Sequence, residues 1–160
     1  MSPRHARAAR RPARLTAPGL LLGVGLGGFV DGIVLHQILQ WHHMLTSEGS
    51  HPASTVAGLE ANTLADGLFH AAAWLAVLGG LWALWSATRH GAVWSFRRLA
   101  GLMLAGWGLF NLVEGLVDHH LLGLHHVRTG ADELPYDLAF LALGAVLVAG
   151  GLAIARSAER

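Results

Sequence analysis

The residues best suited to chemistry are histidines and carboxylates that interrupt long apolar stretches. Asp66 and His70 lie four residues apart, and Glu114 and Asp118 repeat that spacing, so each pair would share one face of a helix. Helical bundles hold iron, manganese, zinc or copper(II) with imidazole and carboxylate groups from facing helices. The sequence therefore predicts a metal site. Its main candidates are His36, His70, His119, Glu114, Asp118, Asp31 and Asp66, and its secondary candidates are His42, His43, His125, His126 and Asp137.

Two other interpretations of these residues stay open. An imidazole ring is comfortable at the level of the lipid headgroups, where it needs no ligand. That interpretation fits the histidines near the ends of the apolar stretches, namely His42, His43, His51, His120, His125 and His126. Chains of Asp, Glu and His can also pass protons through a membrane protein without any metal.

A fifteen-residue segment that contains several candidates occurs twice. Residues 30–44 align without a gap to residues 113–127, and seven of the fifteen positions are identical. Asp66 and Phe69 find weaker counterparts in Asp137 and Phe140. The chain is therefore a duplicated two-helix hairpin, and parallel repeats of this kind are related by a pseudo-twofold axis along the membrane normal. We expect the duplicated residues to converge near that axis.

The elements that must position these residues are four apolar stretches, each near the roughly 20 residues that a helix needs to cross a bilayer. Of 160 residues, 53% are hydrophobic and only 13% are charged. A spanning segment must satisfy its own backbone, which favours helices. We predict an all-α bundle of four transmembrane helices at about 19–41, 64–85, 99–122 and 136–155, within a domain 19–155 between tails 1–18 and 156–160.

Arginine positions predict the orientation. Ten of the eleven arginines fall in the two tails or between the second and third stretches, and Arg128 is the exception. By the positive-inside rule both termini are cytoplasmic, and the loops 42–63 and 123–135 face outward. The basic start resembles a secretory signal, but no A-x-A-like cleavage site follows it, so we expect a retained first helix.

The absence of cysteine restricts the chemistry. Disulfides, thiolate metal sites and iron–sulfur clusters are excluded, so a metal must take nitrogen or oxygen ligands. The glycine-rich run from Gly23 to Gly28 follows no strand and is not a dinucleotide motif. Glycines spaced four apart at Gly19, Gly23 and Gly27 instead favour close helix packing.

The two His-His segments, residues 30–44 and 110–128, resemble a bacterial family of predicted membrane proteins known as domain of unknown function 2243. The resemblance extends over all four stretches. It implies a four-helix protein of the bacterial inner membrane, and it implies no activity.

These observations favour a multi-pass inner-membrane protein with an outer-leaflet site for iron, copper or zinc. The first hypothesis for its function is a redox metalloenzyme. The alternatives are metal delivery or sensing for respiratory enzyme assembly, a proton relay, a zinc hydrolase, and haem b held by His36 and His119, against which the nearby carboxylates argue. Beside the lipid bilayer, the partners considered are a second copy of the chain and a respiratory-chain protein. Nucleic acid is not expected.

Overall fold

The computed structural model describes residues 13–89 and 92–158. Most of the basic tail, residues 1–12, and the final residues 159–160 therefore lie outside the described part of the chain. Two of the helices continue without a break into π-helical segments, labelled η1 and η2. The elements are α1 (Thr16–Val30), η1 (Asp31–Ile38), α2 (Val56–Thr88), α3 (Phe96–Glu114), η2 (Gly115–Leu121) and α4 (Glu133–Ser157).

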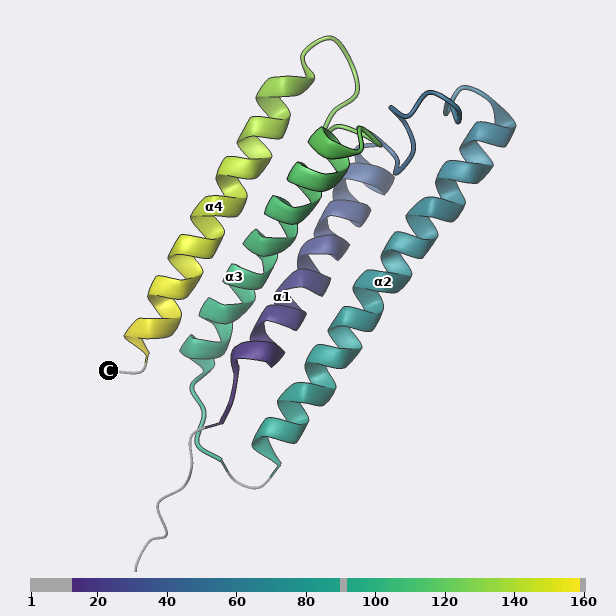
Figure 1. The fold of residues 1–160 in the computed structure, drawn as a ribbon. Coiled ribbons are helices and arrows are strands. Elements are labelled where there is room, and N and C mark those ends of the chain that lie inside the picture. Colours follow the sequence, from purple (N-terminus) through teal and green to yellow (C-terminus); the bar gives the residue numbers. More distant parts are fainter. Residues whose placement is uncertain (1–12, 90–91, 159–160) are drawn as a thin grey trace, which may run out of the picture.

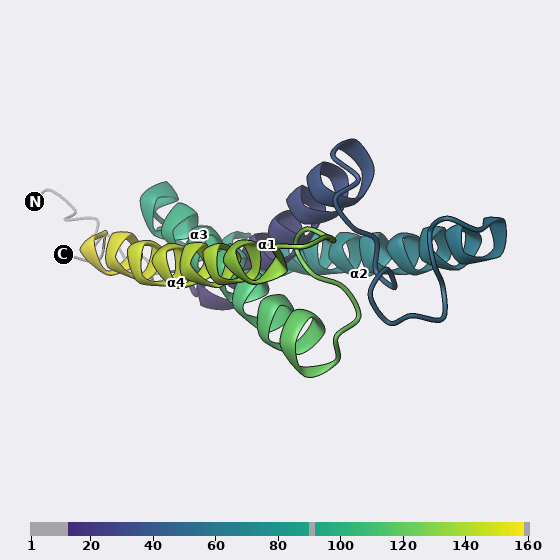
Figure 2. The same ribbon diagram turned by 90° about the horizontal axis from the view of Figure 1, so that it is seen from above.

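The four helices confirm the predicted all-α membrane fold. Within the described residues, α1 with η1, α2, α3 with η2, and α4 are each long and apolar enough to cross a bilayer. They stand side by side in the order α4, α3, α1, α2 (Figure 1), so α1 and α3 form the centre and each carries one flanking helix. Seen from above, α1 and α3 run obliquely across each other (Figure 2). Both long loops, 39–55 and 122–132, lie at the same end.

Glycines bring the two central helices together. A Cβ at Gly23 would collide with the backbone carbonyl of Met103, and a Cβ at Gly106 would collide with that of Leu20. Small residues at such crossings let helix backbones approach closely in a membrane. Because these two contacts are equivalent under the repeat, the axis of the duplication passes between α1 and α3.

The helix ends differ in detail from the apolar stretches. The second helix begins at Val56, well before the stretch from residue 64, because the Thr55 hydroxyl caps it by accepting the Gly58 backbone N–H at 3.1 Å. The first helix ends at Ile38 rather than near Trp41. The residues after Ile38 turn back toward the bundle, and this turn shapes the site.

Candidate metal centre

The π-helical segments place the acidic residue of each repeat beside a histidine five residues later. A π-helix closes hydrogen bonds from residue i to i+5, so residues five apart come to lie one turn above each other. In η1 the Nε2 atom of His36 lies 3.1 Å from Oδ2 of Asp31. Glu114, the last residue of α3, and His119 in η2 have the same spacing, and their ligand atoms lie within 4.8 Å of each other.

A left-handed turn ends each π-helical segment and sends the chain back inward. Gln40 has φ 50° and its counterpart Gly123 has φ 59°. The next residue in each repeat donates its backbone N–H to a carbonyl six residues back, at 2.9 Å from Trp41 to Leu35 and at 2.9 Å from Leu124 to Asp118. These bonds complete the helix cap. As a result, the residues that follow the turn point into the bundle.

His42 and His125 are the residues that these turns bury. Their side chains are almost completely enclosed, and their rings stack with centroids 4.6 Å apart and planes 7° apart. The His36 ring meets the His42 ring edge-on at 4.4 Å, and the His119 ring meets the His125 ring at 4.8 Å. Four imidazoles, two from each repeat, thus gather near the pseudo-twofold axis.

The imidazoles and two carboxylates form one cluster. Three overlapping groups of ligand atoms each lie within 4.8 Å of one another, and every member is buried. The groups share His36, His125 and Glu114, which joins them into a single set. The members of this set, called the central cluster below, are Asp31, His36, His42, Glu114, His119 and His125.

Hydrogen bonds fix how three of these rings face the cluster. Nδ1 of His36 lies 2.9 Å from Oδ1 of Asp66, while Nδ1 of His42 donates to the carbonyl of Val127 at 2.8 Å. Nδ1 of His125 donates to the carbonyl of Met44 at 3.4 Å. A neutral imidazole with its proton on Nδ1 carries a lone pair on Nε2. The Nε2 atoms of all three rings are buried and have no hydrogen-bond partner among the described residues.

Two histidines of the central cluster, His42 and His125, lie outside the membrane-spanning segments, and both are neutral at physiological pH. Burial in a site with little water lowers the pKa of His42 to about 2 and that of His125 to about 3. Both values lie far below 7, so each ring holds one proton there. The lone pairs of both Nε2 atoms are consequently available to a cation.

Carboxylate oxygens of the cluster also lack hydrogen bonds among the described residues, and Oδ2 of Asp31 has a 3.1 Å contact with Nε2 of His36. Neither side-chain oxygen of Glu114 has a hydrogen bond within the described chain, and Oδ2 of Asp31 has none either. Oε1 of Glu114 lies 3.6 Å from the Nε2 atom of His125. Two buried carboxylates that face bare nitrogen lone pairs repel them, unless a cation or a proton lies between them.

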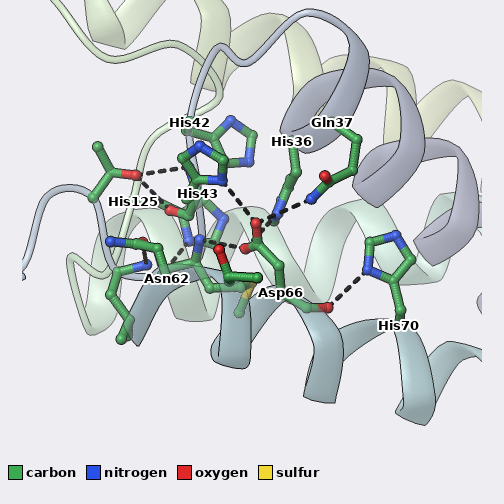
Figure 3. A network of polar contacts seen from close by, with 12 residues as sticks. His36, Gln37, His42, His43, Asn62, Asp66, His70 and His125 are labelled. Atoms are coloured by element: carbon green, nitrogen blue, oxygen red, sulfur yellow. Dashed lines mark hydrogen bonds and ion pairs between the residues drawn. The ribbon is translucent and has the colours of Figure 1, made fainter. Parts of the chain in front are cut away.

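A second pair of carboxylates surrounds the cluster. Asp66 on α2 accepts from Nδ1 of His43 at 2.7 Å and from the Met44 backbone N–H at 3.0 Å, in addition to its contact with His36. In the other repeat Asp137 on α4 lies 2.6 Å from Nδ1 of His126 and 3.2 Å from Nδ1 of His119. Figure 3 shows the first of these arrangements. Asp66 and Asp137 thus hold histidines that line the cluster.

Some of the predicted site residues lie in or around the central cluster, and others lie away from it. It brings Asp31, His36, Glu114 and His119 into the central cluster, and it surrounds them with Asp66, Asp137, His43 and His126. His70 lies apart from the cluster (Figure 3), where its Nδ1 contacts the backbone carbonyl of Asp66 at 2.7 Å.

Asp118 is also outside the three groups, because the π-helical segment pairs Glu114 with His119 at i+5 and not with Asp118 at i+4. Asp118 and His70 thus share no ligand group with the residues of the cluster. His42 and His125, which the sequence ranks second, lie at its centre. The sequence signal that could have ranked His42 and His125 among the main candidates is the duplicated His-His motif just after each apolar stretch.

The described chain is therefore a multi-pass membrane protein with buried His and carboxylate groups that could hold a metal ion. It belongs to the family described as predicted membrane protein (DUF2243), whose family model matches residues 18–158. This confirms the family that the repeated motifs indicate. The chain has no match among curated proteins or solved structures.

Proposed function

We propose that this protein binds a transition-metal ion, iron, copper or zinc, in the central cluster. The observation that carries the proposal is the set of lone pairs that make no hydrogen bond within the described chain and converge in a buried space. They belong to the Nε2 atoms of His36, His42 and His125 and to the carboxylates of Asp31 and Glu114. Nitrogen and oxygen donors together suit these three metals.

The second layer of contacts supports this ligand set. A histidine that ligates a metal nearly always donates its other ring N–H to a carboxylate or a backbone carbonyl, which fixes the tautomer and the ring orientation. His36 contacts the carboxylate of Asp66 in this way, and His42 and His125 donate to backbone carbonyls. The cluster thus has both the inner donors and the outer supports of a metal site.

The location of the site follows from the charge bias. The cluster lies at the end of the bundle that carries the loops 39–55 and 122–132, opposite the end where α2 finishes and α3 begins, near Arg89, Arg97 and Arg98. By the positive-inside rule this end faces away from the cytoplasm. We place the site in the outer leaflet of a bacterial inner membrane.

Burial favours a metal that stays bound over one that is exchanged with a partner. Metal delivery needs ligands that a partner can reach, and a zinc hydrolase needs access for water, yet His36 and His125 are 0% exposed. The stacked His42 and His125 rings each lie against both His36 and His119, so they occupy the space that a porphyrin held by His36 and His119 would need. A metal ion that stays bound fits these features, and within that class we propose iron or copper in a redox metalloenzyme.

A metal-free proton relay is the second candidate, and one observation favours it. His43, Asp66 and His36 form a continuous chain from the partly exposed His43 ring to the cluster, and His126, Asp137 and His119 form another. In this alternative a protonated His36 lies between Asp31 and Asp66, at 3.1 and 2.9 Å. Metal content separates the two candidates.

The test is elemental analysis by mass spectrometry, with an optical spectrum, on detergent-purified protein. Wild type is compared with the double variant His36→Ala/His119→Ala and with the control His51→Ala, whose ring contacts Glu48 on the surface at 2.5 Å. We expect stoichiometric metal in the wild type and the control, and none in the double variant. Equal metal content in all three proteins, or none in any after reconstitution, would contradict a metal centre here.

A further inference from the structure

An apolar pocket adjoins the central cluster on one side of the bundle. It has a volume of about 320 Å³ and is lined by α1 with η1, by α3 and by α4, together with one residue from each outer loop. The helix α3 lies between α1 and α4 in the row of helices (Figure 1), so a pocket lined by all three lies over α3. Small-molecule pockets in proteins start at about this size, with volumes of about 300–1,000 Å³.

Two polar side chains mark the inner wall of this pocket. Asp31 belongs both to the pocket lining and to the central cluster, so the two spaces share a wall. Asn111 lines the pocket from α3 and is only 1% exposed. Its Oδ1 atom has no hydrogen-bond partner in the part of the chain that the structure describes. A buried amide oxygen without a partner is costly, and a donor group on a ligand would satisfy it.

Aromatic residues make up much of the remaining wall, namely Trp41, Trp107, Tyr136 and Phe140. The Trp41 and Tyr136 rings meet edge-on at 5.7 Å, and the guanidinium of Arg128 lies over both, at 5.7 and 5.3 Å from the ring centroids. The rings of Trp41 and Tyr136 thus form part of the pocket wall. Such a wall suits an aromatic ring, which packs edge-on or offset against others.

The pocket opens toward the lipid. Val30, Val34 and Leu143 belong to its lining and are 40%, 37% and 48% exposed, and all three lie within membrane-spanning segments. A ligand would therefore enter sideways from the bilayer and not from water. Its body must be apolar and its head must donate a hydrogen bond.

We infer that this pocket binds a membrane-soluble aromatic alcohol of the hydroquinone class. The ring lies among the aromatic residues, and a hydroxyl group donates to Oδ1 of Asn111 beside Asp31. Binding goes beyond the proposed metal centre and does not depend on it, because the pocket and its acceptor consist of protein atoms alone.

Calorimetric titration of the protein in lipid nanodiscs with duroquinol, under anaerobic conditions, tests this inference. Duroquinol dimethyl ether has the same ring but no hydroxyl donor. We expect saturable binding of duroquinol by the wild type. The wild type should bind the ether, and Asn111→Leu should bind duroquinol, about tenfold more weakly, since one hydrogen bond is worth about 1.4 kcal/mol.

A matched pair of variants on α4 locates the site. Ala139 lines the pocket, whereas Ala145 lies exposed on the same helix outside it. Ala139→Phe should fill the pocket and abolish binding, and Ala145→Phe should bind like the wild type. The absence of saturable binding by the wild type would overturn the inference. Equal effects of the two Phe variants, or equal affinity for quinol and ether, would do so too.

Metal content measured on the same samples keeps this test separate from the proposed function. If His36→Ala/His119→Ala still binds duroquinol, the pocket stands whether or not metal is present. If Ala139→Phe keeps its metal and loses only duroquinol, the pocket and the metal site are distinct. Loss of quinol binding in Ala145→Phe would instead indicate a general effect on the helix and would count against the pocket.

Discussion

The two repeats of this protein agree closely where they build the central cluster and differ in what surrounds it. Each repeat supplies one carboxylate and two histidines, one π-helical segment and one left-handed turn. By contrast, Leu35 of the first repeat corresponds to Asp118, and Leu141 of the second corresponds to His70. Neither Asp118 nor His70 belongs to the cluster. The residues that could hold a metal are thus matched between the repeats, while the neighbouring residues differ.

The pocket beside the cluster reflects the same divergence. Gly27 lines it in the first repeat, and the corresponding residue of the second repeat is Phe110, whose ring packs against Phe69 at 6.0 Å. A glycine on one side and a phenyl ring on the other give the two flanks of the cluster different shapes. We infer that symmetry serves metal binding and that asymmetry controls what approaches the metal.

The largest expected effect is a loss of bound metal, and it tests whether both repeats supply metal ligands. His42→Ala and His125→Ala each remove one of the stacked rings, so each should reduce the bound metal to a small fraction of the wild-type amount. Elemental analysis of both variants, side by side, measures this. Full retention of metal in one of them would show that a single repeat binds the ion and would break the comparison.

The next effect concerns the carboxylates that orient the histidines. Replacement of such a residue weakens metal binding by about 10–100-fold, and we expect this for Asp66→Asn and Asp137→Asn. Asp66 should matter more, because it hydrogen-bonds to His36 at 2.9 Å and also accepts from Gln37 at 3.3 Å, whereas Asp137 lies 3.2 Å from His119. Competition with a chelator of known affinity measures both constants, and a larger loss in Asp137→Asn would reverse this ranking.

The glycine crossing should respond equally from either repeat. Gly23→Ala and Gly106→Ala each place a Cβ against the backbone of the other central helix, so each should lower the free energy of unfolding by about 1–3 kcal/mol or more. Gly79→Ala and Gly150→Ala are matched controls, because nothing lies within 4 Å of the added atom. Thermal unfolding in detergent compares the four. A difference between the two central variants would argue against an axis between α1 and α3.

The smallest effect separates the two left-handed turns. Gly123→Ala should destabilise the protein by about 1–2 kcal/mol, because a Cβ is unfavourable at φ 59°. Gln40→Gly should stabilise it by up to about 1 kcal/mol, because φ 50° already strains that residue. The same unfolding assay measures both, and a loss of stability in Gln40→Gly would mean that its side chain makes a contact worth more than the strain.

Much of the fold could be predicted from the sequence, because its signals are strong and local. Apolar length and composition predict the helices, and the aligned segments predict the duplication and the convergence of Asp31 with Glu114 and of His36 with His119. The prominence of Asp118 and His70 came from α-helical i,i+4 spacing. In η2 the π-helical backbone shifts that spacing to i+5 and pairs Glu114 with His119, and sequence spacing alone does not reveal where the backbone widens. The helix α2 stays α-helical, but His70 directs its Nδ1 to the backbone carbonyl of Asp66 and not to the cluster.

The roles of His42 and His125 depend on a single backbone conformation after each helix. The left-handed turn at Gly123 is typical of glycine, but Gln40 gives no such sign, and without the turn both rings would lie at the headgroup level. Their burial is therefore a tertiary outcome. The pocket is one too, since its wall combines residues from three helices and two loops.

The most direct test of the central claim is anomalous X-ray diffraction from crystals of the metal-loaded protein, recorded at the absorption edge of the element that analysis identifies. We predict anomalous density inside the central cluster, at about 2.0–2.2 Å from the Nε2 atoms that face it. Density beside His43, His126 or His51 alone, or none in a protein shown to contain the metal, would contradict the account.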